Sequence, residues 1–283
     1  MDLHTPAQGL SPPKHPPPGA TARLRRHWRE ATLVAVLLAL LAGFMASGPR
    51  AQHQAYHDFA DQRLLLGVPN LLDVASNLPF LVVGVLGLAL YRTRRRPPFA
   101  APLATSWAAL FAGVVLVAFG SAWYHWAPGD ASLLWDRLPM TLGFMGLFVA
   151  LLAEHVSPRL DRLLLGPALA TGVASALWWH ATGDLRWYYW VQFSPLVCLP
   201  LVLAMYPARY THRLHLLYAL GLYVAAKLAE SADRGLFDLT GHAVSGHTLK
   251  HLLAAGALAV LLHMLWRRAP VGQAPTHAPS KPS

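Results

Sequence analysis

The chain has 283 residues, of which 55% are hydrophobic and only 13% carry a charge. Soluble domains average about 25% charged residues, so this composition excludes a disordered chain, a coiled coil and most soluble folds. The single cysteine, Cys198, excludes an internal disulfide framework and a zinc site built from cysteines. We therefore expect an all-α integral membrane protein that crosses the bilayer several times.

Eight apolar stretches of about 17–24 residues are long enough to cross a hydrocarbon core of roughly 30 Å as helices. The polar, proline-rich segment 1–30 and the similar segment 269–283 have too few apolar residues to form a core, so both are expected to be disordered tails. The first apolar stretch, 31–48, is longer than the apolar region of a usual signal peptide, which favours an uncleaved transmembrane helix over a cleaved leader. The expected stretches are 31–47, 72–91, 102–125, 134–155, 162–180, 188–206, 214–233 and 246–266.

Lysine and arginine residues are concentrated before the first stretch and in every second connection after it, following 72–91, 134–155, 188–206 and 246–266. The positive-inside rule then places both termini in the cytoplasm. This distribution accounts for the net charge of +10, and we predict no nucleic-acid partner. A composition rich in alanine, leucine and arginine suggests a bacterial inner membrane.

Ionisable side chains inside a membrane span are costly, so each one requires a structural or functional reason. Four polar groups lie near the ends of the apolar stretches, and the orientation above places all four at the outer, periplasmic face. Their common depth predicts a single polar site. The groups are Gly120–His125, Asp136–Met140, Gly246–His251 and the set Asn70, Asp73, Ser76 and Asn77.

His247 and His251 are four residues apart and therefore share one helix face, the spacing with which two imidazoles hold one zinc ion. His125 is a candidate third ligand, with Ser121 one turn away on the same face. Three nitrogen ligands leave a fourth position for water, as in catalytic zinc sites, and zinc lowers the pKa of that water to about 7. Asp136 is then the candidate proton acceptor, and Ser121 is the candidate donor to the oxygen of an attacked carbonyl.

Each of these residues also has a structural interpretation. A pair of histidines at this spacing can occur by chance among 15 histidines. Asp136 suits the first turn of a helix, and Ser121 can bond to a helix carbonyl. Lys227 and Glu230, which lie deeper in the stretch 214–233, are interpreted as a structural ion pair. The coincidence of three histidines, one serine and one aspartate at one depth favours the zinc site.

The motifs resemble those of the alkaline ceramidases, which belong to a larger set of seven-helix proteins that includes the adiponectin and progestin receptors. The family pattern is an SxxxH, then a D-[ER]-L-P-M stretch, then an HxxxH. Here these are Ser121–His125, Asp136–Met140 and His247–His251, in the same order. Ser76-Asn77-Leu78 also resembles the SNL of the family's first core helix.

The resemblance covers about residues 56–266 and implies a seven-helix core at 55–268, with 31–48 as an extra N-terminal transmembrane helix. It implies hydrolysis of the amide bond of a ceramide-like lipid to a fatty acid and a sphingoid base. Matched positions give zinc ligands at His125, His247 and His251, a water-orienting acid at Asp136 and an oxyanion-stabilising serine at Ser121.

One segment departs from the family pattern. The ceramidases have a calcium site before their first core helix, built around a D-W-x-E-x-N stretch and a later glutamate. The nearest match here is Asp58-Phe59-Ala60-Asp61-Gln62-Arg63, with Arg63 where an asparagine would be. One hypothesis is that Arg63 replaces calcium by pairing with Asp58 or Asp61. The residues of this candidate second cation site, or of its replacement, are Asp58, Asp61, Asn70 and Asp73.

We therefore expect a zinc-dependent membrane hydrolase that acts on lipid amides drawn from the surrounding membrane lipids. Hydrolysis of a lipid amide other than ceramide is equally consistent with the residues. One alternative is a lipid-responsive, receptor-like membrane protein with a non-catalytic zinc site, against which the water-facing Asp136 argues. Another is a metal or proton transporter, which would need polar groups along the whole depth of the membrane.

Overall fold

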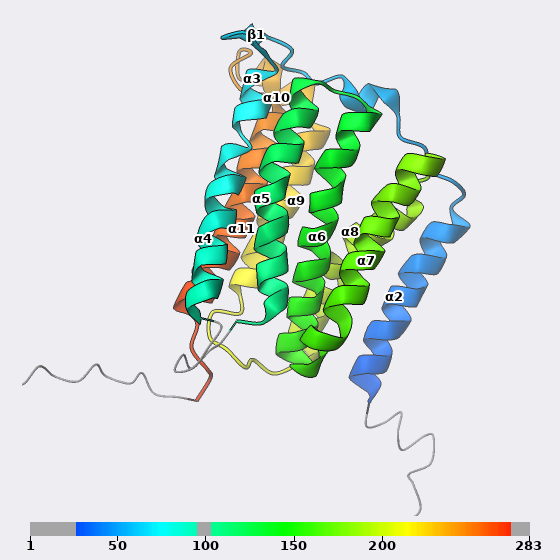
Figure 1. Cartoon of the computed structure of the whole chain (residues 1–283), viewed down its shortest axis with the longest axis vertical. Helices are drawn as coiled ribbons and strands as arrows, with labels where there is room; N and C mark the ends of the chain where they lie inside the picture. Colours follow the sequence, from blue (N-terminus) through cyan, green and yellow to red (C-terminus); the bar gives the residue numbers. More distant parts are fainter. Residues whose placement is uncertain (1–26, 95–102, 273–283) are drawn as a thin grey trace, which may run out of the picture.

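The computed structural model describes residues 27–94 and 103–272. The tails 1–30 and 269–283, which are expected to be disordered, lie largely outside the described residues. In the described part the chain is almost entirely helical, and the long helices run side by side as one bundle (Figure 1). A two-stranded hairpin, β1 (Leu64–Leu65) with β2 (Val68–Pro69), extends from one end of the bundle.

The long helices follow the expected apolar stretches closely, and the shorter elements lie between them. The long helices are α2 (Trp28–Ala46), α4 (Leu78–Arg94), α5 (Thr105–Trp126), α6 (Asp130–His155), α7 (Arg159–Thr182), α8 (Arg186–Met205), α9 (His215–Ser231) and α11 (Gly246–Arg267). The short helices are η1 (Gln54–His57), α3 (Leu71–Ala75) and α10 (Asp233–Leu239).

Seven helical segments in the described residues are long and apolar enough to cross a membrane, namely α2, α5, α6, α7, α8, α11 and the combined segment Leu71–Arg94. The expected stretch 214–233 is divided, because α9 ends at Ser231 and α10 begins at Asp233. α9 has 17 residues, the lower limit of the roughly 17–25 that span a bilayer. The all-α membrane fold with an extra N-terminal helix is confirmed.

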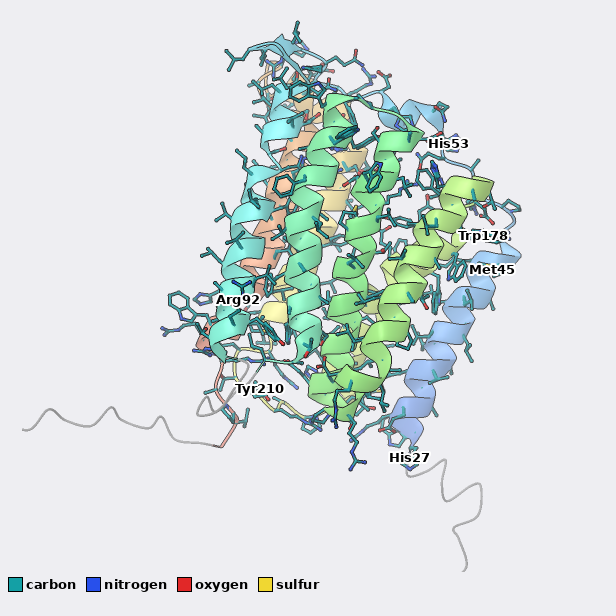
Figure 2. All side chains as sticks on the ribbon, viewed as in Figure 1. His27, Met45, His53, Arg92, Trp178 and Tyr210 are labelled. Atoms are coloured by element: carbon teal, nitrogen blue, oxygen red, sulfur yellow. The ribbon has the colours of Figure 1, made fainter. Side chains whose placement is uncertain are left out.

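α2 is the extra helix and lies at the edge of the bundle, where it packs against α8. Its two ends, near His27 and Met45, lie toward opposite ends of the bundle (Figure 2). Leu33 is its one buried residue. The indole N–H of Trp190 donates to the carbonyl oxygen of Leu37 at 3.0 Å, and the Arg186 guanidinium donates to that of Met45 at 2.8 Å. The helix is therefore attached to the bundle through a smaller apolar cluster, whereas the main core is built without it.

The main hydrophobic core lies between α4, α5, α6, α8, α9 and α11, with Trp107 and Phe111 fully buried in it. The C-terminal end of α5 and the N-terminal ends of α3, α6 and α11 lie together at the upper end of the bundle in Figure 1. We call this the site end, because it collects the polar residues that the sequence singles out. The opposite end carries the basic connections, including Arg92 (Figure 2).

Candidate metal centre

Three buried histidine side chains from two distant parts of the chain meet at the site end. His125 lies in the last turn of α5, whereas His247 and His251 lie in the first two turns of α11. Their ligand nitrogens are within 4.8 Å of one another, and their ring centroids are 4.6 to 5.0 Å apart. In residues 27–94 and 103–272, no other group of histidine, cysteine, aspartate or glutamate side chains is arranged to share one ion. The cluster could hold a metal ion.

The environment of His125 fits a metal ligand. Its side chain is completely buried, and neither ring nitrogen has a hydrogen-bond partner. Buried polar atoms nearly always have a partner, so two unpartnered nitrogens on one ring require an explanation. A metal ion bound by one of the two nitrogens would account for that nitrogen, since the neutral imidazole is the form that ligates metals.

Ser76 orients the imidazole of His251. The Ser76 Oγ lies 2.7 Å from Nδ1 of His251, and its hydroxyl donates to the carbonyl oxygen of Asp73 at 3.0 Å. Because the hydroxyl proton is used by that carbonyl, the serine oxygen accepts from Nδ1–H of His251. The lone pair of Nε2 is then left free for an ion, which is the usual arrangement of a metal-binding histidine.

A close helix contact fixes His247. A Cβ atom on Gly246 would meet the carbonyl oxygen of Ala229 and the backbone of Asp233, so α11 can start this close to α9 and α10 only with glycine there. The Asp233 carboxylate accepts from the backbone N–H of His247 at 2.7 Å and from that of Ala60 at 2.9 Å. Asp233 thus joins the start of α11 to the segment that covers the site.

Ser121 and Asp136 meet where α5 and α6 approach each other most closely. A Cβ atom on Gly120 would collide with the carbonyl oxygen of Trp135, the residue before Asp136. This contact places the turn of α5 that carries Ser121 against the turn of α6 that carries Asp136. Ser121 is 2% exposed and Asp136 is 7% exposed, and both line an internal cavity together with His251.

This cavity has a volume of about 280 Å³ and extends from the histidine cluster into the bundle. Its polar end is formed by the site residues, and the rest of its wall is apolar. A cavity of this kind suits a ligand with one polar group and a hydrocarbon tail. The apolar wall includes Phe80, Leu110, Val114, Leu147, Leu199, Ala257 and Leu261.

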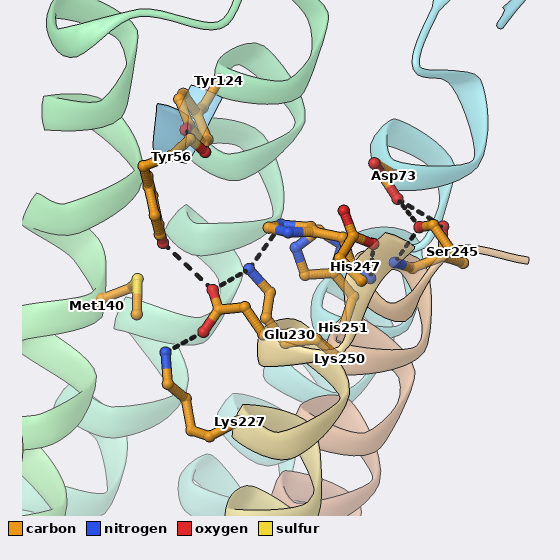
Figure 3. A network of polar contacts seen from close by, with 12 residues as sticks. Tyr56, Asp73, Tyr124, Met140, Lys227, Glu230, Ser245, His247, Lys250 and His251 are labelled. Atoms are coloured by element: carbon orange, nitrogen blue, oxygen red, sulfur yellow. Dashed lines mark hydrogen bonds and ion pairs between the residues drawn. The ribbon is translucent and has the colours of Figure 1, made fainter. Parts of the chain in front are cut away.

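A charged network borders the same cavity (Figure 3). Lys227 and Glu230 form the predicted ion pair, but Glu230 also pairs with Lys250 at 3.1 Å and accepts from the Tyr56 hydroxyl at 3.2 Å. The Lys250 ammonium lies 2.6 Å from Nε2 of His247. The three histidine, serine and aspartate motifs do not predict this contact between Lys250 and His247. The one indication in the sequence is that Lys250 lies three residues after His247 and therefore near it on the same helix.

The residues aligned with a calcium site have other partners. Asp61 is buried and forms two hydrogen bonds with Arg63, both at 2.7 Å, whereas Asp58 pairs with Arg234 at 2.5 Å. Burial opposes ionisation of Asp61, but the hydrogen bonds from Arg63 hold its pKa below the usual value. Of the two partners considered for Arg63, the structure selects Asp61.

Asn70 and Asp73 serve the histidine cluster instead. The Asn70 amide donates to the carbonyl oxygen of His125 at 2.7 Å. The Asp73 carboxylate accepts from Ser245 at 2.9 Å and from Thr248 at 2.5 Å, which holds the first turn of α11. All four side chains are thus engaged by other groups, and the metal-ligand cluster found among the described residues includes none of the three aspartates. They do not fit a calcium site.

Phe59 closes the site from the side of the 58–63 segment. Its ring centroid lies 4.6 Å from that of His125 and 4.7 Å from that of His247, and the side chain is 3% exposed. The segment therefore covers the histidines with an apolar ring and keeps bulk water away from them. Comparison of the chain with family models, curated proteins and solved structures finds no match.

Proposed function

We propose that the chain is a membrane-embedded, zinc-dependent amidohydrolase that cleaves a ceramide-like lipid into a fatty acid and a sphingoid base. The observation that supports this most directly is the meeting of three buried histidines with Ser121 and Asp136 at the polar end of an apolar cavity. A purely structural metal site would not need an acid and a hydroxyl group facing a cavity of this kind. The resemblance of the three motifs to those of the alkaline ceramidases supports the same reaction.

Zinc is the proposed metal because His125, His247 and His251 form a three-nitrogen set, the pattern of catalytic zinc sites. No fourth histidine, cysteine, aspartate or glutamate joins this set within the described residues. Zinc held there would act as a Lewis acid toward the amide carbonyl and would make water nucleophilic near neutral pH. Ser76 and Asp73 support this ligand set from outside, through His251 and the first turn of α11.

The protein groups supply the proton transfers. The Asp136 carboxylate accepts the proton of the attacking water and passes it to the amide nitrogen, so that the C–N bond breaks as a neutral amine leaves. The Ser121 hydroxyl donates to the carbonyl oxygen as it gains negative charge. Because the site is buried under Phe59, these interactions act with little competition from solvent.

The apolar cavity wall is the proposed site of a hydrocarbon chain of the substrate. The wall runs from Ser121 and His251 toward Leu147 and Leu261, along the interior of the bundle. A lipid that remains in the membrane can place its amide at the polar end while its tail stays in an apolar environment.

We also propose that the protein lies in a bacterial inner membrane, with both termini in the cytoplasm and the site end in the periplasm. The basic residues at the end opposite the site support this orientation. In a Cys198→Ser background, a membrane-impermeant maleimide should label Leu66→Cys on intact cells and leave Arg92→Cys unlabelled. The reverse pattern would contradict the orientation.

The activity is tested by incubating the purified protein with a panel of ceramides and measuring the released fatty acid. The wild type should hydrolyse at least one of them, and Asp136→Ala should retain its metal yet release no fatty acid. Zinc binding in the wild type, with no hydrolysis of ceramides or other lipid amides, would contradict the proposal and favour the receptor-like alternative.

A further inference from the structure

The charged side chains that line the cavity do not balance. They are Asp136, Arg137, Lys227, Glu230 and Lys250, three of them basic and two acidic. Glu230 is shared, because it pairs with both Lys227 and Lys250. One carboxylate therefore serves two ammonium groups.

Arg137 is the third cation of the cavity, and no carboxylate of the described residues pairs with it. Its side chain is 5% exposed, and Nη1 has no hydrogen-bond partner among these residues. Every ion pair within 4.0 Å in the described part of the chain joins other residues. Nη2 donates to the Gln52 side chain at 2.5 Å, and the group stacks 4.0 Å above the Trp179 ring. These contacts hold the guanidinium in place without neutralising it.

An excess of positive charge inside a membrane protein is costly unless an anion compensates for it. A metal ion at the histidine cluster would increase that excess, since its three imidazole ligands are neutral. Lys250 already lines the cavity, and Glu230 is its acidic partner there. A site that holds a metal ion would therefore contain more uncompensated positive charge.

Lys227 is the member of the network that a lipid can reach. Its side chain is 48% exposed, and it lines both the internal cavity and a second cavity of about 840 Å³ beside α2. Gln192 and Tyr223, hydrogen-bonded to each other at 2.7 Å, line both cavities as well. The two cavities thus meet at Lys227, on the side of the bundle where the extra helix lies.

We propose that Lys227 and Lys250 form an oxyanion-binding subsite of the cavity, with Arg137 contributing to its positive field. This subsite rests on the proposed amidohydrolase function, for which it defines the ligand chemistry. The oxyanion is either the carboxylate of the released fatty acid or an acidic group on the amine portion of the substrate. Both sources place a negative oxygen next to the ammonium groups and an alkyl chain along the apolar wall.

Binding is tested first without turnover, by quenching of intrinsic tryptophan fluorescence in the purified, metal-loaded protein. Hexadecanoate should bind at least about 10-fold more tightly than hexadecanol, and Lys227→Met should remove that difference. Glu230→Gln should act in the opposite direction and tighten hexadecanoate binding, because it removes the negative charge that both lysines share. A variant that merely damages the fold would not tighten binding.

Arg234→Met is the matched control, since it removes one positive charge at the same end of the bundle but lies outside the cavity wall. It should leave hexadecanoate binding unchanged. Equal binding of hexadecanoate and hexadecanol, or equal hexadecanoate binding by the wild type and Lys227→Met, would overturn the subsite.

Hydrolysis of two matched amides distinguishes the two sources of the oxyanion. A lower KM for N-hexadecanoylglycine than for N-hexadecanoylethanolamine, lost in Lys227→Met, assigns the subsite to an acidic substrate. Equal KM values together with tight hexadecanoate binding assign it to the product. Ceramide hydrolysis without selective hexadecanoate binding would overturn the subsite alone, whereas hexadecanoate binding without any hydrolysis would overturn the proposed function alone.

Discussion

The Ser76 hydroxyl oxygen and Nδ1 of His251 are 2.7 Å apart, although the two residues are separated by 175 positions in the sequence. Ser76 follows α3 directly, and His251 lies in the second turn of α11. The contact fixes which nitrogen of His251 carries the proton and therefore which nitrogen faces the other two histidines. One serine outside the ligand set thus prepares the metal centre.

Ser76→Ala should weaken metal binding by about 10- to 100-fold, as the loss of a hydrogen bond to a ligating histidine typically does. The affinity is measured by competition with a chelator of known strength. Ser175→Ala is the control, because Ser175 is equally buried but donates only to the carbonyl oxygen of Gly172. Equal metal affinity of Ser76→Ala and the wild type would show that Ser76 does not support the centre.

Gly120→Ala should separate α5 from α6 where Ser121 and Asp136 meet. Its Cβ atom would overlap the carbonyl oxygen of Trp135, which is backbone and cannot rotate away. Overpacking of this kind costs about 1–3 kcal/mol, so the unfolding temperature should fall and activity should fall with it.

Gly143→Ala is the matched control on the same pair of helices. Its Cβ atom would meet only the side chain of Leu110, at an ordinary 3.7 Å. This variant should unfold at the wild-type temperature or slightly above it, because alanine lowers the entropy of the unfolded chain. An equal loss of stability in both variants would show that the close contact of Gly120 with Trp135 is not the cause of the destabilisation.

Asp136→Asn should lower kcat by about 10²- to 10⁴-fold, because asparagine cannot accept the proton of the attacking water. Ser121→Ala should lower kcat by about 10²- to 10³-fold through loss of the donor to the carbonyl oxygen. Both should keep their metal and much of the wild-type KM, as steady-state kinetics and metal analysis would establish. Asp130→Asn, on the same helix but exposed, should leave kcat unchanged. A normal kcat in Asp136→Asn would exclude the proposed proton acceptor.

Asp184 should contribute to the attachment of the segment that follows α2. Hydrogen bonds from Arg186 lower the pKa of Asp184 to about 2, and the backbone N–H of Arg50 also donates to this carboxylate. Since this pKa lies below the unfolded value of about 3.9, the attachment is complete above pH 4 and is lost as the pH falls toward 2. Its energetic contribution is small, because the pair is near the surface.

Limited proteolysis measures this attachment. Pepsin should cut the segment after α2 faster as the pH falls from about 4 to 2, beyond the pH dependence seen with an unstructured peptide of the same sequence. Asp184→Asn should already be cut faster than the wild type by trypsin after Arg50 at neutral pH. Unchanged cutting in both experiments would mean that this ion pair does not hold the segment after α2.

The bundle could be predicted because a bilayer imposes a length and an apolar composition on each span. The pairing of His247 with His251 could be predicted because four residues make about one helical turn. The end of α9 is harder to predict, because α9 stops at Ser231 and a separate helix, α10, begins at Asp233. Composition alone does not show where such a break between two helices occurs.

The supporting contacts could not be predicted in the same way. The bond of Ser76 to His251, and that of Lys250 to Glu230, depend on which helices are neighbours and how they are rotated. The nearby chain offers Arg63 two possible partners, Asp58 and Asp61. The turn of the backbone decides between them, because it brings Asp61 within 2.7 Å of Arg63. Sequence spacing describes contacts within a helix, whereas these contacts join separate elements.

The proposed hydrolysis requires a zinc ion at the histidine cluster. The direct measurement is the zinc content and the ceramide turnover of the wild type and of His251→Ala, purified side by side in mild detergent. About one zinc ion per chain in the wild type, lost in His251→Ala together with fatty-acid release, is the predicted result. Freshly prepared wild type that contains no zinc, or His251→Ala that still releases fatty acid at the wild-type rate, would contradict the account.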